Sequence, residues 1–235
     1  RYMDQPQLVP WQYIFGRGLT IFIILNLYLY FEEGINFYKN YKKIGKSGLL
    51  GGCGLGVAMI SFIYSITNTS AAITLLCLAA MPFFTALLAF LFLKERISLN
   101  VWISIFIATI GIIIMAFGNT EKSSVIGFIF GITSSIGFSV FSVTLRWRKE
   151  TPKFTTVAVA GLFCFVVATM VILTKNQPFF ATSYNSTMFS LHGTLVCLGL
   201  ILYSIGSKAI PAAELTLLSL TEVIGGIFWV WLPLF

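Results

Sequence analysis

Long apolar runs alternate with short polar connections along most of the chain. Residues 72–93 form one such run, with 22 positions and no charged side chain. At about 1.5 Å per residue, a helix of this length crosses the roughly 30 Å of a bilayer core. Lys94, Glu95 and Arg96 follow directly and would stay among the lipid headgroups. This pattern predicts a membrane-spanning helix.

Seven further runs have the same character, and they lie at residues 11–31, 48–66, 101–117, 125–145, 154–173, 191–207 and 212–234. The chain is 57% hydrophobic and 10% charged, with a mean hydropathy of +0.92, whereas soluble domains carry about 25% charged residues. The composition therefore excludes a water-soluble fold. It predicts an all-α integral membrane protein, a helical bundle with eight spans.

The positive charges gather on one side of the predicted membrane. Eleven lie in connections that face this side: Lys39, Lys42, Lys43, Lys46, Lys94, Arg96, Arg146, Arg148, Lys149, Lys153 and Lys208. The other side receives Arg1, Lys122 and Lys175. Because Lys and Arg are retained on the cytoplasmic face, we expect the first side in the cytoplasm. Both chain ends then lie outside, so we expect one further span before Arg1 and another after Phe235.

Two stretches of the chain resemble each other, residues 64–93 and residues 203–234. Each has a span ending in Tyr-Ser-Ile, a tight turn, an Ala-Ala helix start and a Leu-rich run. The run contains Pro82 in the first stretch and Gly225-Gly226 in the second, and we expect a helix interruption at each. The stretches are five spans apart, so they would cross the membrane in opposite senses. Such inverted repeats are typical of secondary transporters, although apolar helices also align by chance.

These residues resemble the EamA-type branch of the drug/metabolite transporter superfamily. The resemblance rests on Arg17, on Pro82 with the stop at 94–98, on Trp102 and Gly111, and on the segments 209–214 and 221–223. Members are ten-span proteins of two inverted five-span repeats, and they move amino acids, nucleosides, nucleotide sugars and other organic compounds. The resemblance implies that residues 1–118 are a first repeat without its first span. Residues 119–235 would then be a second repeat without its last span.

Two charged residues, Arg17 and Glu222, lie well inside predicted spans. Glu222 lies ten positions after Ala212, where a carboxylate costs roughly 2.5 to 3.5 kcal/mol on insertion scales unless it faces a cavity, finds a partner or takes up a proton. We interpret it as a cavity or proton-coupling residue, with a structural hydrogen bond as the alternative. Arg17 lies about a turn and a half inside the first run. Snorkelling to the interface, pairing with another helix and contact with an anionic substrate all fit it.

The run 125–145 carries a face of small residues, formed by Gly127, Gly131, Ser135, Ser139 and Ser142 at helical spacing. Small residues let another helix approach closely, and hydroxyls also line water-filled paths. Tight packing is the favoured interpretation, and Ser135 and Ser139 are the candidate cavity residues of this face.

Polar groups at the ends of spans complete the set of candidate cavity or gate residues. Tyr64, Asn68 and Tyr203 are such groups, and anchoring of aromatic rings at the interface is the rival explanation. Pro82 is a candidate because it permits a helix to bend.

The leading hypothesis is a secondary transporter of small organic metabolites, such as amino-acid-, nucleoside- or drug-like compounds, that works by alternating access. A passive channel or a non-transporting scaffold is the alternative. An intramembrane enzyme is least favoured, because the chain has one histidine, His192, and one aspartate, Asp4. We expect a small-molecule substrate and membrane lipid as partners, no nucleic acid, no metal and no cofactor, with a homodimer left open. The membrane is a bacterial inner membrane or a eukaryotic plasma or organellar membrane.

Overall fold

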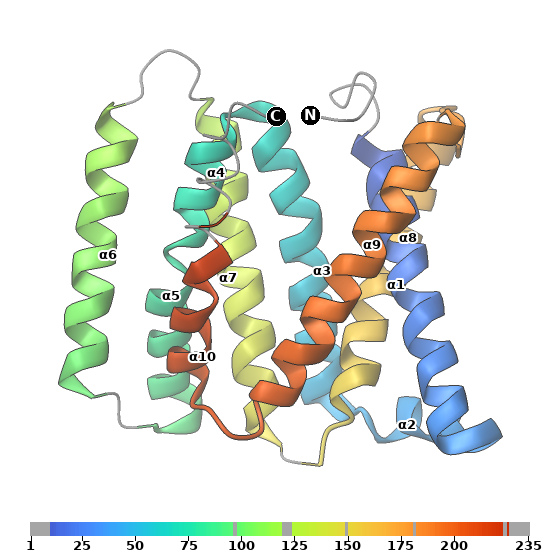
Figure 1. Ribbon diagram of the computed structural model, residues 1–235, viewed down its shortest axis with the longest axis horizontal. Helices are drawn as coiled ribbons and strands as arrows, with labels where there is room; N and C mark the ends of the chain where they lie inside the picture. The colour runs from blue at the N-terminus through green and yellow to red at the C-terminus, as the bar shows by residue number, and fades with distance from the viewer. Residues whose placement is uncertain are drawn as a thin grey trace.

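The computed structural model describes residues 10–95, 98–118, 124–148, 150–180, 182–222 and 225. Within these residues every regular element is a helix (Figure 1). The elements are α1 (Pro10–Glu33), a 3₁₀ turn (Gly34–Phe37), α2 (Tyr38–Lys43), α3 (Gly45–Asn68), α4 (Ala71–Leu78), α5 (Met81–Leu88), a π-helical turn (Ala89–Leu93), α6 (Leu99–Gly118), α7 (Val125–Trp147), α8 (Lys153–Thr174), α9 (Ser183–Gly206) and α10 (Ala212–Leu218). The predicted all-α class is confirmed over the described residues.

Six helical segments of the described chain are long and apolar enough to cross a membrane. They are Pro10–Lys43, Gly45–Asn68, Ala71–Leu93, Val125–Trp147, Lys153–Thr174 and Ser183–Gly206. Six of the predicted runs are thus confirmed, and the chain is a multi-pass membrane protein. The run 101–117 forms α6 and the run 212–234 begins as α10, but neither is among the six. Residues 226–234 lie outside the described part, and the totals of eight or ten spans stay predictions.

The connections between the helices alternate between two ends of the bundle. Figure 1 shows the connections α1–α3, α5–α6, α7–α8 and α9–α10 together at the lower end. These connections and the helix ends beside them carry Lys39, Lys42, Lys43, Lys46, Lys94, Arg146, Arg148, Lys153 and Lys208. Arg96 and Lys149 lie outside the described residues. The charges grouped from the sequence therefore share one physical end, which we call the cation-rich end.

Paired glycines bring two helix pairs into backbone contact. Where α1 crosses α8, a Cβ atom on Gly18 would lie 2.8 Å from the carbonyl oxygen of Gly161, and one on Gly161 would lie 2.9 Å from that of Gly18. Gly54 of α3 and Gly137 of α7 meet in the same way, at 3.0 and 2.6 Å. Small residues are the usual means of close approach between membrane helices. Because α3 also packs against α8, these four helices form the centre of the bundle.

The run 72–93 is interrupted, as Pro82 predicts. Helix α4 ends at Leu78, a turn follows at residues 79–80, and α5 begins at Met81 with Pro82 in its first turn. Proline has no N–H and its ring clashes with the carbonyl four residues earlier, so the chain departs from the helix in the turn before it. The interruption therefore lies two to three residues before Pro82.

The last run is interrupted earlier than its sequence predicts. Helix α10 ends at Leu218 and Ser219 lies in a turn, whereas Gly225 is helical and Gly226 lies outside the described residues. Ser219 Oγ donates to the carbonyl oxygen of Thr216 at 2.7 Å. A serine hydroxyl that bonds a nearby carbonyl competes with the helical backbone bonds. Most of the residues around the expected interruption at Gly225-Gly226 lie outside the described part, so that interruption stays a prediction.

Candidate functional site

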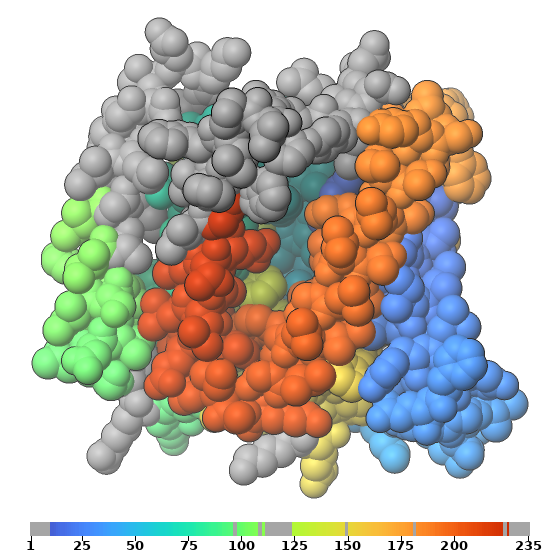
Figure 2. All heavy atoms as spheres, viewed as in Figure 1, coloured from blue at the N-terminus to red at the C-terminus, as the bar shows by residue number. Residues whose placement is uncertain are grey.

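A cavity of about 550 Å³ lies inside the bundle. Its walls come from α1, α3, α4, α5, α7, α9 and α10, together with the residues that follow α10. Figure 2 shows the hollow between α9 (orange) and α10 (red). Small-molecule sites typically measure about 300 to 1,000 Å³, so this central cavity has the size of a small organic ligand.

Apolar side chains form most of the wall of the central cavity. Phe62, Phe138, Met59 and Leu195 contribute large apolar surfaces from three helices. The polar lining residues are Arg17, Ser134, His192, Tyr203, Ser219 and Glu222. A wall of this kind suits a ligand with a sizeable apolar part and few polar groups.

Arg17 of α1 lines the central cavity. Its side chain is 3% exposed, and Nη2 donates to the carbonyl oxygen of Met59 in α3 at 2.8 Å. The guanidinium carbon lies 5.4 Å from the ring centroid of Tyr13, within the range of a cation–π contact. Arg17 is therefore paired with helix α3, which was one of the roles left open by the sequence, and it also lines the cavity.

Tyr203 of α9 also lines the cavity. Its hydroxyl bonds the hydroxyl of Ser142 in α7 at 2.8 Å, and its ring contacts Phe138 edge-on at a centroid distance of 5.1 Å. Ser142 is 1% exposed. The tyrosine is thus fixed at both its polar and its apolar part, and it holds α9 against α7 beside the cavity.

Glu222 reaches the same cavity from the segment that follows α10. The turn at Ser219 precedes it, and the backbone N–H of Glu222 bonds the carbonyl oxygen of Ser219 at 3.0 Å. Ser219 also lines the cavity. The carboxylate therefore lies directly after a helix interruption and beside the space that a ligand would occupy.

Ser135 and Ser139 lie in helix contacts. Both are fully buried, and their hydroxyls donate to the carbonyl oxygens of Cys77 and Met81, at 2.5 and 3.1 Å. These bonds fasten α7 to the interrupted pair α4 and α5, which agrees with the favoured packing interpretation. Ser134, one position away, lines the cavity and donates to the carbonyl oxygen of Ala58 at 2.9 Å. A substrate role for Ser135 and Ser139 stays a prediction.

Tyr64, Asn68 and Pro82 lie outside the set of residues that line the cavity. Tyr64 packs its ring against Trp11 and Phe130, at centroid distances of 5.2 and 5.3 Å. Asn68 is exposed at the end of α3, where its Nδ2 donates to the carbonyl oxygen of Tyr64 at 2.7 Å. Pro82 is buried in the first turn of α5. A gate role for these three residues stays a prediction.

His192 is a cavity residue that the sequence reasoning missed. The predicted run of residues 191–207 puts His192 at the end of a span, where a hydrated side chain is expected. Helix α9 instead begins at Ser183, capped by the Thr182 hydroxyl, which accepts the N–H of Asn185 at 3.3 Å. His192 therefore lies well inside α9, where Nδ1 contacts the Tyr13 hydroxyl. The cap at Thr182 is the sequence signal that would have extended the helix.

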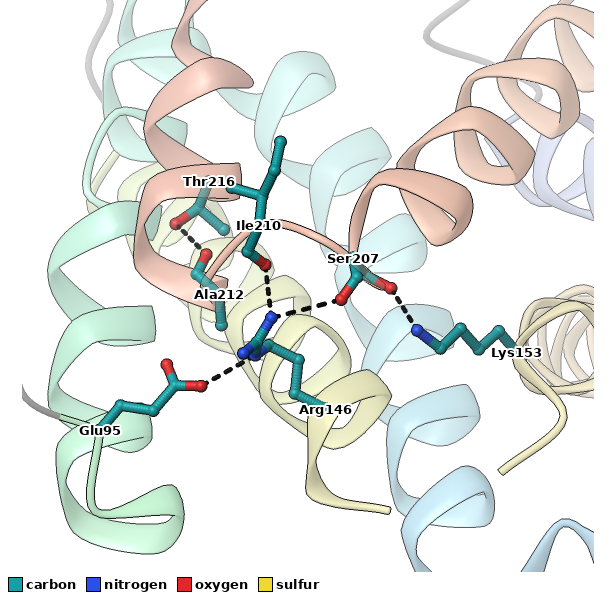
Figure 3. A network of polar contacts seen from close by, with 7 residues as sticks. All are labelled: Glu95, Arg146, Lys153, Ser207, Ile210, Ala212 and Thr216. Atoms are coloured by element: carbon teal, nitrogen blue, oxygen red, sulfur yellow. Dashed lines mark hydrogen bonds and ion pairs between the residues drawn. The ribbon is translucent and has the colours of Figure 1, made fainter. Parts of the chain in front are cut away.

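Arg146 joins several helix ends at the cation-rich end of the bundle (Figure 3). Its Nε donates to Glu95 Oε1 at 2.8 Å, and its Nη1 donates to the carbonyl oxygens of Ile210 and Ser207 at 2.7 and 3.4 Å. Lys153 Nζ bonds the Ser207 hydroxyl at 3.0 Å. This polar network links the end of α7 to the segment after α5, to the α9–α10 turn and to the start of α8. We call it the Arg146 latch.

Comparisons with known proteins agree with the apolar, membrane-spanning helices. Residues 2–117 match the EamA-like transporter family. Over 229 residues the chain is 25% identical to an uncharacterized transporter of Helicobacter pylori strain J99, covering 94% of this chain and 76% of that protein. An uncharacterized transporter of H. pylori strain 26695 matches with the same identity and coverage. The chain is a multi-pass membrane protein, and these similarities indicate a transporter that resembles the EamA-like family through residues 2–117.

Proposed function

We propose that the chain is a secondary transporter of small organic metabolites and that it works by alternating access between two inverted repeats, residues 1–118 and 119–235. The observation that carries the proposal is the central cavity, because both proposed repeats contribute to its wall. Helices α1, α3, α4 and α5 come from the first, whereas α7, α9 and α10 come from the second. A binding site between two halves is the arrangement expected of such a carrier.

The helix contacts support a two-fold relation between the repeats. In a two-fold interface, equivalent residues contact each other reciprocally. Gly18 and Gly161 do so at the α1–α8 crossing. They are separated along the chain by nearly the same interval as Tyr64 and Tyr203, which occupy matching places in the two similar stretches.

The two interrupted helices also contact each other. Ala86 of α5 and Ala213 of α10 belong to one buried cluster, and Ala89, which follows α5, shares another with Ala212. Each helix has a turn about eight residues after its start, at residues 79–80 and at Ser219. Paired interruptions in facing helices support the proposed repeat, and they provide points at which the helices can bend.

The Arg146 latch gives the proposed mechanism a closed end. It joins helix ends of both proposed repeats, Glu95 in the first and Arg146 and Ile210 in the second. Access from the cation-rich end, which we place in the cytoplasm, would require these bonds to break. Rocking of the two repeats would then expose the cavity to each side in turn.

Counterflow in proteoliposomes tests the proposed function. The purified chain is reconstituted, the vesicles are loaded with an unlabelled compound, and uptake of the same labelled compound is followed for a panel of amino acids, nucleosides and drug-like molecules. A carrier shows transient accumulation that depends on the internal compound. Uptake without this trans-stimulation would indicate a passive channel, and no uptake of any compound would favour a scaffold.

A further inference from the structure

The guanidinium of Arg17 has bonding capacity that its protein contacts leave unused. An arginine carries five N–H donors. Nη2 donates to the carbonyl oxygen of Met59, but Nε is buried and has no hydrogen-bond partner among the described residues. Arg17 is 3% exposed and lines the central cavity, so its guanidinium borders the space that a ligand would occupy.

The positive charge of Arg17 is also without a counter-charge in the described part of the chain. The one ion pair found there joins Arg146 to Glu95, so no described carboxylate lies within 4.0 Å of Arg17. Glu222 lines the same cavity from the segment that follows α10 but forms no ion pair with the guanidinium. Tyr13 lies beside the guanidinium, but it is a neutral side chain and its hydroxyl also contacts His192. A buried cation without a partner is costly.

The rest of the cavity constrains what could supply the missing charge. Phe62 and Phe138 present aromatic surface, and Leu195 and Val196 add aliphatic surface. A small inorganic anion would leave these walls without contacts. A molecule that places an anionic group on Arg17 and an apolar body against these residues would satisfy both parts of the site.

We infer that Arg17 is an anion subsite of the central cavity, and that the ligand is an amphipathic organic acid whose carboxylate binds the guanidinium. The inference rests on the proposed transport function only in treating this ligand as the substrate. Planar guanidinium groups bind carboxylates through two parallel hydrogen bonds. With Nη2 held by Met59, the unpartnered Nε supplies one of the remaining donors.

Calorimetric titration of the purified full chain in a neutral detergent tests the subsite. The probes are 3-phenylpropionate and its neutral amide, 3-phenylpropanamide, which differ in charge and hardly in size. We expect the acid to bind the wild-type chain at least ten times more tightly than the amide. Arg17→Gln removes this preference, whereas Arg17→Lys retains part of it because the charge remains. Lys175→Gln is the control, since Lys175 is exposed and lies outside the cavity lining.

Three results would overturn the subsite: equal binding of acid and amide to the wild-type chain, no binding of the acid, or equal weakening of both probes by Arg17→Gln. The last would mean that Arg17 only fastens α1 to α3. Counterflow separates this inference from the proposed function. A charge preference without counterflow would keep the subsite and reject the carrier. Counterflow without a charge preference would keep the carrier and reject the subsite.

Discussion

Arg146 Nε donates to Glu95 Oε1 at 2.8 Å, across the gap between the end of α7 and the segment after α5. The two side chains are 26% and 24% exposed, and ion pairs in contact with water contribute only about 0.2 to 1 kcal/mol. Arg146 also holds two carbonyl oxygens of the α9–α10 turn. The latch therefore joins helix ends through several contacts, of which the ion pair contributes only modestly.

Weakening the latch should expose the cavity from the cation-rich end. Glu95→Gln removes the negative charge, so we expect faster opening by up to about fivefold, the factor that corresponds to 1 kcal/mol. The reporter is Gly199→Cys, because Gly199 lines the cavity and a Cβ there meets no atom within 4 Å. Cys53, which is half-buried, is first replaced by serine. Labelling by a membrane-impermeant maleimide from the cytoplasmic side measures the opening.

Glu150→Gln is the matched control for the latch. Glu150 is an exposed carboxylate in the α7–α8 connection, near the same end of the bundle. The Glu150→Gln substitution removes one negative charge, as Glu95→Gln does, but it removes no contact of the Arg146 latch. Equal labelling rates in Glu95→Gln and in the wild-type chain would show that the ion pair does not limit access.

The α1–α8 crossing should tolerate no added methyl group. A Cβ on Gly18 would lie 2.8 Å from the Gly161 carbonyl oxygen and 2.9 Å from the backbone nitrogen of Phe165. Backbone atoms cannot move aside as a side chain can, so Gly18→Ala should cost about 1 to 3 kcal/mol of unfolding free energy. Thermal unfolding in detergent measures the loss. Gly199→Ala adds the same methyl group in open space and should cause no loss of unfolding free energy. Equal losses in the two variants would show that the close backbone contact is not the cause.

The hydrogen bond between Tyr203 and Ser142 can be tested with a double-mutant cycle, which separates the energy of the bond from the effect of losing each hydroxyl. Tyr203→Phe removes one hydroxyl and leaves the buried Ser142 hydroxyl without its partner across the helices. We expect a loss of about 1 to 3 kcal/mol in unfolding free energy. Adding Ser142→Ala removes the second group and should recover most of the loss. Thermal unfolding of the four members of this cycle measures the coupling, and strict additivity would mean that the bond contributes nothing.

The sequence predicted helix positions well because apolar runs and charged stops follow from the thickness of the bilayer. Pro82 located one interruption because a missing N–H acts wherever the proline lies. At the Ser219 turn, the serine hydroxyl donates to the carbonyl oxygen of Thr216. A sequence does not show which acceptor a serine hydroxyl bonds, so this turn was not predicted. The start of α9 was missed because its first turns are polar, so an apolar window excluded them.

Three of the candidate residues named from the sequence, Arg17, Tyr203 and Glu222, line the cavity. Arg17 and Glu222 carry charge within spans, and both line the cavity. Phe62 and Phe138 were not found, because apolar side chains face lipid, core and cavity alike in such a chain. Ser135 was named as a cavity residue, whereas its neighbour Ser134 lines the wall. One residue turns a helix by about 100°, and sequence spacing alone does not fix which helix faces which.

Proton coupling through Glu222 is the last prediction. The carboxylate lines the cavity directly after the turn at Ser219, so it could take up a proton from one side and release it to the other as access alternates. Glu222→Gln keeps the shape and removes the exchangeable proton. We expect counterflow to persist and uptake driven by an imposed pH gradient to disappear. Glu214→Gln is the control, because Glu214 is exposed in the first turn of α10 and lies outside the cavity lining. Gradient-driven uptake that survives Glu222→Gln would remove this carboxylate from the coupling mechanism and leave the cavity and its anion subsite unaffected.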